Sequence, residues 1–438
     1  MKPKAIKHKL TSAIKLISSK PDACCFNPGK DFSRTRKISV NTLISGLIGM
    51  EGKSLSNELI DLFDKSSDIP TPSAFVQQRV KLKPQAMYDV FRVFTDSTSS
   101  YTASELTMLA IDGSEIRIPD NPEDESTRIR RFSNSDPYNS LHLNALYDIN
   151  RGVYTDILIQ NGAQKNEHRA LQQMVDSSII PKALVLADRG YESYNNMAHI
   201  QEKGWYFLIR IKDGNHGIKT GFSLPEDNEF DLSIKLKITR RHTKEAKKLQ
   251  KDKNQYRCIS NSTPFDYLPS RSVEKAPSIF YSLNFRIVRF RLNDDTYETI
   301  LTNLSTEEYP PDKIKRLYAA RWGIETSFRN LKYTLALLKF HSKKTVCICQ
   351  EIYARLIMYN FIGMITSHVI IEKKERKYNY KVNFSTAAHA CRLFFLGRTQ
   401  PSNLESVIAS FLIPIRTDRH RKRFAKHEML YGFFYRIA

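Results

Sequence analysis

The stretch that decides the interpretation of this chain runs from residue 318 to 332 and reads Tyr-Ala-Ala-Arg-Trp-Gly-Ile-Glu-Thr-Ser-Phe-Arg-Asn-Leu-Lys. It carries four polar side chains of interest. After Tyr318, Arg321 follows at three residues, Glu325 at seven and Lys332 at fourteen. At 3.6 residues per turn, these offsets place all four within roughly 60° of one helix face. An apolar stripe lies beside them, made of Leu317, Ile324, Phe328, Leu331 and Leu335. The stretch is therefore predicted to be a helix with one flank in a core and a charged flank next to it.

The charged flank combines a carboxylate with two cations and a phenol. A carboxylate such as that of Glu325 suits a divalent metal ion, whereas Arg321 and Lys332 suit phosphate oxygens. The alternative is an ordinary solvated helix face with salt bridges between residues four apart. Other parts of the chain favour the first interpretation.

Two short apolar runs each end on an aspartate, with a glycine one or two residues later. Residues 106–112 end on Asp112, before the turn-forming Gly113, and residues 183–188 end on Asp188. A carboxylate at the carboxyl end of a buried strand lies at the mouth of an open α/β sheet, where such folds bind ligands. With Glu325, these aspartates would supply oxygen ligands for a pair of hard cations. The alternative for either aspartate alone is a turn or helix-cap role.

Together the three segments resemble the DDE transposases of bacterial insertion sequences, specifically the IS-four family. The signature of that family, Y-x₂-R-x₃-E-x₆-K, is matched in full between residues 318 and 332. An Asp-Gly motif at Asp112 and an Asp-Arg-Gly-Tyr motif from Asp188 precede it in the expected order. The resemblance covers about residues 105–340.

The resemblance implies a transposase that binds the terminal inverted repeats of an insertion sequence and moves the element by cutting and joining DNA strands. It implies that Asp112, Asp188 and Glu325 are catalytic and hold two Mg²⁺ ions, for which Mn²⁺ can substitute. It also implies that phosphates of the DNA are held by Tyr318, Arg321 and Lys332. Further expected DNA contacts are four arginines, with ordinary charged loops as the alternative: Arg128, Arg130, Arg131 and Arg189.

Two other functions share parts of this pattern. A metal-dependent DNA nuclease without strand transfer needs the same carboxylates. A catalytically silent DNA-binding descendant of a transposase is the second alternative, and the intact set of three carboxylates argues against it.

The expected fold class is α/β. Strands are predicted at 106–112, 141–148, 153–159, 183–188 and 206–211, with helices at 165–176 and 194–203. This order is that of an RNase H-like core, of the kind found in retroviral integrases, and the family resemblance implies the same fold.

Around that core the sequence predicts additional segments. Residues 1–100 are predicted to form a helical N-terminal DNA-binding domain, with a helical cap on the next domain as the alternative. The catalytic core spans 101–340, with a mostly β insertion at about 212–308. Residues 341–438 are predicted to form a helical region for dimerisation or DNA contact.

Several acidic and aromatic residues remain as weaker candidates. Asp148 and Asp156 lie on predicted strands but lack the following glycine, and Glu192 is the nearest rival to Glu325 as third ligand. Family relatives stack a tryptophan of the insertion on a flipped base. No tryptophan lies in this insertion, so Tyr297 and Phe290 are its candidates.

Composition points to a polyanionic partner. The 438 residues carry a formal charge of +22, with basic clusters at 2–20, 235–257, 373–381 and 416–426. Such an excess favours nucleic acid, here double-stranded DNA at the transposon ends and the target. The resemblance adds a homodimer in the synaptic complex.

The apolar and cysteine patterns argue against a membrane or an oxidising compartment. The most apolar stretch, 356–371, is short and interrupted by polar residues, and therefore reads as a buried core helix. The six cysteines lack zinc-type spacing and are expected to be reduced thiols. The expected location is the bacterial cytoplasm, in association with the nucleoid.

Overall fold

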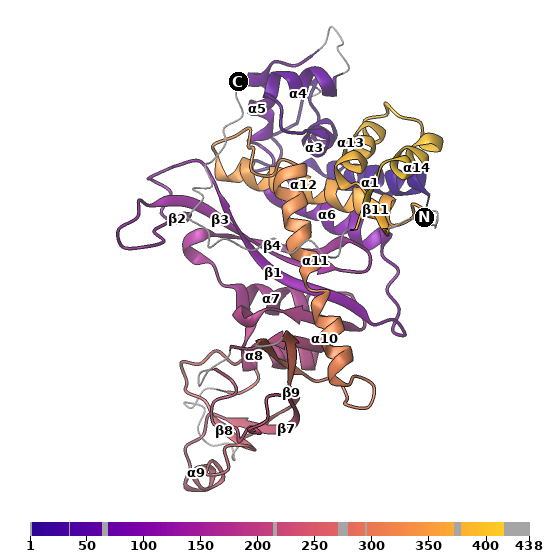
Figure 1. The fold of residues 1–438 in the computed structure, drawn as a ribbon. Coiled ribbons are helices and arrows are strands. Elements are labelled where there is room, and N and C mark those ends of the chain that lie inside the picture. Colours follow the sequence, from indigo (N-terminus) through magenta and orange to yellow (C-terminus); the bar gives the residue numbers. More distant parts are fainter. Residues whose placement is uncertain are drawn as a thin grey trace.

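The computed structural model describes residues 2–34, 36–63, 69–212, 217–269, 279–293, 296–371 and 378–415. It shows a mixed α/β fold with a large central sheet and helices from both ends of the chain gathered at one end of that sheet (Figure 1). The basic cluster predicted at 416–426 and most of the one at 373–381 lie outside the described residues.

The central sheet contains every strand predicted for the core. Its strands are β1 (Thr107–Arg117), β3 (Tyr138–Asp148), β4 (Val153–Asn161), β5 (Ala183–Ala187) and β6 (Tyr206–Arg210). β1 pairs antiparallel with β3, which pairs antiparallel with β4, whereas β1, β5 and β6 run parallel. Helices α7 (Glu167–Asp176) and α8 (Tyr194–Glu202) provide the crossovers that parallel strands need. The short β2 (Arg128–Ile129) pairs with the beginning of β3.

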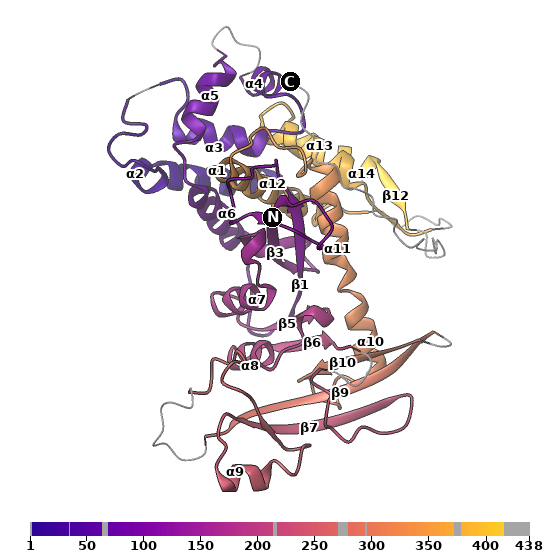
Figure 2. The same cartoon turned by 90° about the vertical axis from the view of Figure 1, so that its left-hand side faces the viewer.

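The predicted insertion continues the same sheet. It contains β7 (Phe230–Thr239), α9 (Lys244–Leu249), β8 (Tyr256–Cys258), β9 (Tyr281–Asn293) and β10 (Thr296–Thr302). β10 pairs antiparallel with β6, β9 with β10, and β7 with β9. Figure 2 shows these strands at the end of the molecule opposite the helical region. The segment is therefore rich in β-structure, as predicted, and it extends the core sheet.

Helices from both ends of the chain form one layer. The N-terminal helices are α1 (Pro3–Ser18), α2 (Pro21–Cys24), α3 (Val40–Gly49), α4 (Leu55–Leu62), α5 (Pro72–Arg79) and α6 (Pro84–Thr98). The C-terminal elements are α12 (Thr345–Thr366), α13 (Phe384–Phe395), α14 (Pro401–Ser410) and the strand pair β11 (Tyr380–Val382) and β12 (Leu412–Pro414).

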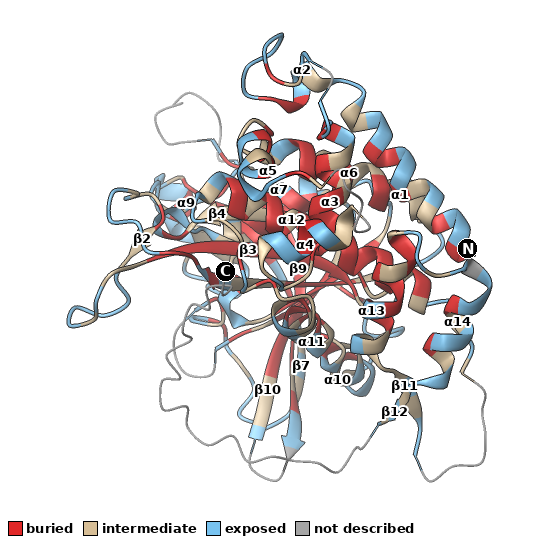
Figure 3. Cartoon of the chain, turned by 90° about the horizontal axis from the view of Figure 1, so that it is seen from above, coloured by how far each residue is buried: buried red, intermediate tan, exposed pale blue. Residues whose placement is uncertain are grey.

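The long helix α12 lies at the centre of this layer. α1, α3, α6 and α13 pack against it, and they share one hydrophobic core with β3 and β4. Nearly all of α12 is buried (Figure 3), as expected of a helix that is apolar on all sides. Within the described part of the chain, no helix combines the length and apolar character that crossing a membrane requires. The N-terminal helices thus pack on the C-terminal helices and share a core with the sheet, and their role, DNA binding or a helical cap, stays a prediction.

Two buried arginines join the end of α3 to the C-terminal helices. Arg355 on α12 donates to the carbonyls of Met50 and Glu51, the latter at 2.6 Å, and Arg392 on α13 donates to the carbonyl of Gly49 at 2.6 Å. The last carbonyls of a helix have no partner within it and favour positive charge. The guanidinium groups therefore cap α3 from neighbouring helices.

We predict that Arg355→Met lowers the free energy of unfolding by about 3–5 kcal/mol, because it leaves buried carbonyls and nearby carboxylates without their donor. Chemical denaturation measures this change. Lys15→Met, at an exposed position of α1, is the matched control and is expected to change stability by less than about 0.5 kcal/mol. A similar small loss for both variants would contradict a capping role.

Candidate active site

Parallel pairing brings the two predicted aspartates to neighbouring positions. Ala110 on β1 lies opposite Leu186 on β5 in the parallel ladder. Asp112 and Asp188 each follow two residues later, so they lie at the same level on strands about 4.8 Å apart. Asp188 also begins the next turn, where its Oδ1 accepts the N–H of Gly190 at 2.8 Å.

The predicted turn at Gly113 is wrong. β1 continues to Arg117, and Gly113 lies within the strand, opposite Asn144. A Cβ on Gly113 would lie 2.4 Å from His142 Nε2 and 2.9 Å from Glu167 Oε1. The glycine is therefore required by close packing inside the sheet, which is the other common reason for a glycine in a strand.

The Glu325 segment is less regular than the single predicted helix. It consists of α10 (Pro311–Ala319), α11 (Trp322–Arg329) and a π-turn over Asn330–Thr334. α11 packs against β1. The Lys332 ammonium, within the π-turn, donates to the backbone carbonyl of Glu115 on β1 at 3.3 Å. Glu325 and Lys332 are thus both carried by elements that lie along the strand of Asp112, although not on one regular helix face.

Tyr318 and Arg321 contact neighbours of the carboxylates. The Tyr318 hydroxyl donates to the carbonyl of Ala187 at 3.2 Å, one residue before Asp188. Arg321 Nη2 lies 2.8 Å from Glu325 Oε1, and its side chain is only 6% exposed. These contacts match the alternative of salt bridging and packing within the protein. The assignment of both residues to DNA phosphates stays a prediction.

The other predicted DNA contacts occupy more exposed positions. Arg189 is exposed beside Asp188, and Arg130 and Arg131 are exposed in the loop between β2 and β3. Arg128 forms a salt bridge with Asp120 at 3.0 Å. Because Arg189, Arg130 and Arg131 are exposed, they are available to a partner. Their predicted contact with DNA stays a prediction.

Burial and the neighbouring charges change the pKa of Asp112. Burial raises the pKa of Asp112 to about 7, and the negative charges of Asp188 and Glu325 act in the same direction. The backbone N–H of Gly113 and the Arg321 guanidinium oppose this rise. A cluster of oxygen donors with excess negative charge has the chemistry that hard divalent cations require.

The three carboxylates are not yet arranged as a finished metal site. Among the described residues, no group of three or more His, Cys, Asp and Glu side chains is placed so that it could hold a metal ion. Glu325 is held by Arg321 instead. The donor types therefore fit a divalent cation, and ligation by all three carboxylates stays a prediction.

Two rival carboxylates are fully engaged by backbone groups. Asp148 Oδ1 accepts the N–H groups of Asn150 and Arg151, both at 3.0 Å. Glu192 Oε1 accepts the N–H of Ile218 at 2.5 Å. Both acids thus stabilise loops.

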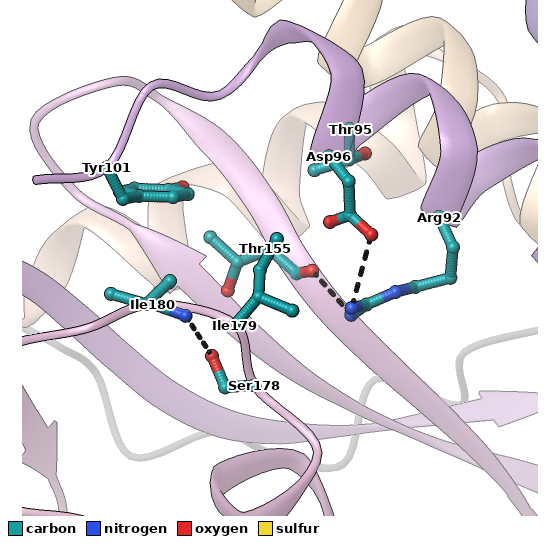
Figure 4. Close-up of a pocket in the computed structure, with 8 residues that line it drawn as sticks. All are labelled: Arg92, Thr95, Asp96, Tyr101, Thr155, Ser178, Ile179 and Ile180. Carbon is teal, nitrogen blue, oxygen red and sulfur yellow. Dashed lines mark hydrogen bonds and ion pairs between the residues drawn. The ribbon is translucent and has the colours of Figure 1, made fainter.

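The third rival, Asp156, belongs to a polar network between α6 and β4. It lies 3.2 Å from Arg92 and accepts the Tyr88 hydroxyl at 3.0 Å. Figure 4 shows Arg92 pointing toward Asp96 and the Thr155 carbonyl at a small pocket in this region. Asp156 therefore has a structural role in attaching α6 to the sheet.

An ion pair that the sequence analysis missed lies behind the two aspartates. His142 Nε2 on β3 is 2.9 Å from Oε1 of Glu167, the first residue of α7. The same carboxylate would lie 3.8 Å from a Cβ on Gly190. The sequence signal for this contact is Gly113, where a Cβ would collide with both partners.

Burial also decides which of the aromatic residues are exposed enough to stack on a DNA base. Phe290 is 3% exposed and packs in a core cluster, so it is unavailable for base stacking. Trp205 is likewise buried, whereas Trp322 is 47% exposed and its ring lies 5.4 Å from the Arg321 guanidinium. Tyr297 stacks with Arg289 at 5.1 Å. The exposed tryptophan next to the carboxylates is Trp322, which lies outside the insertion.

We predict that the metal-free protein loses stability as pH rises from about 4 to about 7, because the raised pKa of Asp112 keeps its carboxyl protonated in the folded state where the unfolded chain has already lost this proton. That stabilisation is fully present below the unfolded pKa near 4. Asp112→Asn should therefore match wild type at pH 4 and exceed it at pH 8 by on the order of 3 kcal/mol. Denaturation at several pH values measures this difference. A difference that does not change with pH would contradict the charge argument.

Comparison with known proteins places the chain in a family. The family model described as "Transposase DDE domain" matches residues 103–361. Transposase InsG for insertion sequence element IS4, of Escherichia coli (strain K12), is 22% identical over 384 residues, covering 84% of this chain and 78% of that protein. The cryo-EM structure of the piggyBac transposase synaptic complex with hairpin DNA aligns at a TM-score of 0.48 and 10% identity, covering 98% of this chain and 88% of that one. The chain belongs to the DDE transposases and, within them, to the IS-four family of insertion sequences.

Proposed function

We propose that the protein binds the terminal inverted repeats of an insertion sequence and catalyses metal-dependent DNA cleavage and strand transfer. The observation that carries this proposal is the placement of Asp112 beside Asp188 on parallel strands, with the Glu325 helix packed on β1. In a DDE transposase these are the positions at which the family motifs place the catalytic carboxylates.

The proposed cofactor is a pair of Mg²⁺ ions held by Asp112, Asp188 and Glu325, with Mn²⁺ as a substitute. Bound divalent ions would stabilise the negative charge that develops at the phosphorus and lower the pKa of an attacking water. The contribution of the protein is to supply two of the carboxylates from neighbouring strands and the third from α11, which packs against β1. Because its pKa is near 7, Asp112 gives up its proton at a pH where a cation can take the place of that proton.

The neighbouring side chains have distinct proposed roles. Arg321 orients Glu325 through their 2.8 Å contact, and Tyr318 fixes the backbone just before Asp188. Lys332 and the exposed Arg189 supply positive charge for DNA phosphates at the edge of the site. Arg130 and Arg131 extend that charge along the loop between β2 and β3.

The rest of the chain is proposed to serve DNA binding and assembly. The strand order β4-β3-β1-β5-β6, with three antiparallel strands followed by two parallel ones, supports an RNase H-like core. We propose that the helical region and the β7–β10 segment contact the transposon ends and target DNA, and that two copies act together in the synaptic complex. This work would take place on the bacterial nucleoid, in the cytoplasm.

We predict that Glu325→Gln lowers Mg²⁺-dependent cleavage by roughly a thousandfold or more, because it removes an anionic ligand while preserving side-chain shape. Binding to duplexes that carry the DNA flanking the coding region should remain within a few-fold of wild type. Glu307→Gln, at an exposed position before α10, is the control and should leave both properties unchanged.

The same assay separates the alternative functions. Cleavage without joining of the ends to a target duplex would identify a nuclease. End binding by wild type with no cleavage in Mg²⁺ or Mn²⁺ would identify a silent descendant. Cleavage that survives Glu325→Gln would show that another residue supplies the third carboxylate.

A second prediction distinguishes Lys332 from Arg321 as DNA contacts. Each lost phosphate contact lowers the slope of log affinity against log salt by about one unit. Lys332→Ala should show this change, whereas Arg321→Ala should leave the slope unchanged and reduce cleavage, because its guanidinium is buried against Glu325. Titrations at several salt concentrations measure both slopes. A lower slope for Arg321→Ala would place this residue on a phosphate after all.

A further inference from the structure

A fully buried tyrosine lies directly beneath the Glu325 helix. Tyr154, on β4, has no exposed surface. Its ring centroid lies 6.1 Å from that of Phe328 on α11 and 4.9 Å from that of Tyr359 on α12. The negative charge of Asp112 also contributes to raising the pKa of Tyr154, after burial as the main cause. Tyr154 is therefore close both to the Glu325 helix and to the aspartate on β1.

The hydroxyl of Tyr154 bonds directly to α11. It lies 2.8 Å from Ser327 Oγ, and Ser327 Oγ donates to the carbonyl of Ile324 at 2.7 Å. A serine hydroxyl has one proton to donate, so Tyr154 is the donor in the bond between them. This bond holds α11 at a position two residues after Glu325, on the side that faces the sheet.

Tyr154 is itself rigidly held by α12. Asn360 accepts the N–H of Tyr154 at 2.8 Å and donates to its carbonyl at 2.8 Å and to Thr95 Oγ1 at 3.0 Å. A Cβ on Gly363 would lie 2.5 Å from the Gly152 carbonyl oxygen, so α12 meets the turn before β4 at backbone distance. Helix α12, in the core of the helical layer, thus supports α11 through Tyr154.

The position of α11 needs such support because both of its ends are irregular. Just before α11, the N–H groups of Arg321 and Gly323 bond to carbonyls three residues back instead of four, and a π-turn begins at Asn330. Functional side chains must be held within about 0.5 Å of their working geometry by the residues around them. We infer that Tyr154 is a positioning residue, whose hydroxyl bond to Ser327 sets the place of Glu325 relative to Asp112. This inference rests on the proposed function, in which Glu325 is a catalytic carboxylate.

The test compares Tyr154→Phe with a matched control, Tyr147→Phe. Tyr147 belongs to the same buried cluster, with ring centroids 5.2 Å from Tyr154, but its hydroxyl bonds to that of Tyr359 at 3.2 Å. Each variant removes one buried hydroxyl bond, and only Tyr154→Phe removes a bond to α11. Two measurements follow: the Mg²⁺ concentration for half-maximal cleavage, and amide hydrogen exchange of residues 322–334 in the metal-free protein.

We expect Tyr154→Phe to raise the half-saturating Mg²⁺ concentration roughly five- to tenfold, the factor that one net hydrogen bond represents. It should also speed exchange across residues 322–334. Tyr147→Phe should change both readouts by less than about twofold. Ser327→Ala should reproduce the effect of Tyr154→Phe, and the double variant should add little to either, because both single changes remove the same bond.

The outcomes separate the two levels of the proposal. If wild type cleaves DNA and the two tyrosine variants match in both readouts, Tyr154 is not a positioning residue and the transposase assignment stands. If wild type does not cleave, the proposed function fails, and this inference fails with it.

Discussion

The pairing of β1 with β5 puts two carboxylates side by side in a partly buried site, and much of the surrounding structure responds to that constraint. Like charges on neighbouring strands repel far more strongly in a protein interior than in water. Burial raises the pKa of Asp112, and the negative charges of Asp188 and Glu325 raise it further, whereas the Gly113 N–H and the buried Arg321 cation oppose this rise. A divalent cation would oppose it more completely, and this is the physical argument for the proposed metal site.

The same edge of the sheet must accommodate yet another carboxylate without adding to the repulsion. Glu167 lies close to the glycines that follow Asp112 and Asp188, and a hydrogen bond from His142 lowers its pKa. The histidine thus favours the ionised form of Glu167. This arrangement leaves no room for a Cβ on Gly113, because His142 and Glu167 both lie too close to it. The glycine that resembles a turn signal in the sequence is in fact a packing requirement of this ion pair.

Local patterns in the sequence predicted the strands, the crossover helices and the adjacency of Asp112 and Asp188, because each of these follows from short-range periodicity and strand direction. Such local patterns do not predict contacts between segments that are far apart in the sequence. The pairing of Thr302 with Leu208, which extends the sheet into the predicted insertion, joins residues almost a hundred positions apart. The interruption between α10 and α11 likewise reflects tertiary packing, since nothing in their spacing departs from a helical period. The Tyr318 hydroxyl likewise bonds to a strand carbonyl that no local pattern reveals.

Helix α12 connects the stability of the fold to the geometry of the site. One of its buried polar residues, Arg355, caps α3, and another, Asn360, clamps the backbone of Tyr154. A buried polar group is expensive unless every partner is in place, so these bonds define one position for α12 rather than a range. Because α12 packs against helices from both ends of the chain, the N-terminal helices help to fix the position of α12. The helical layer is therefore part of the support of the candidate active site.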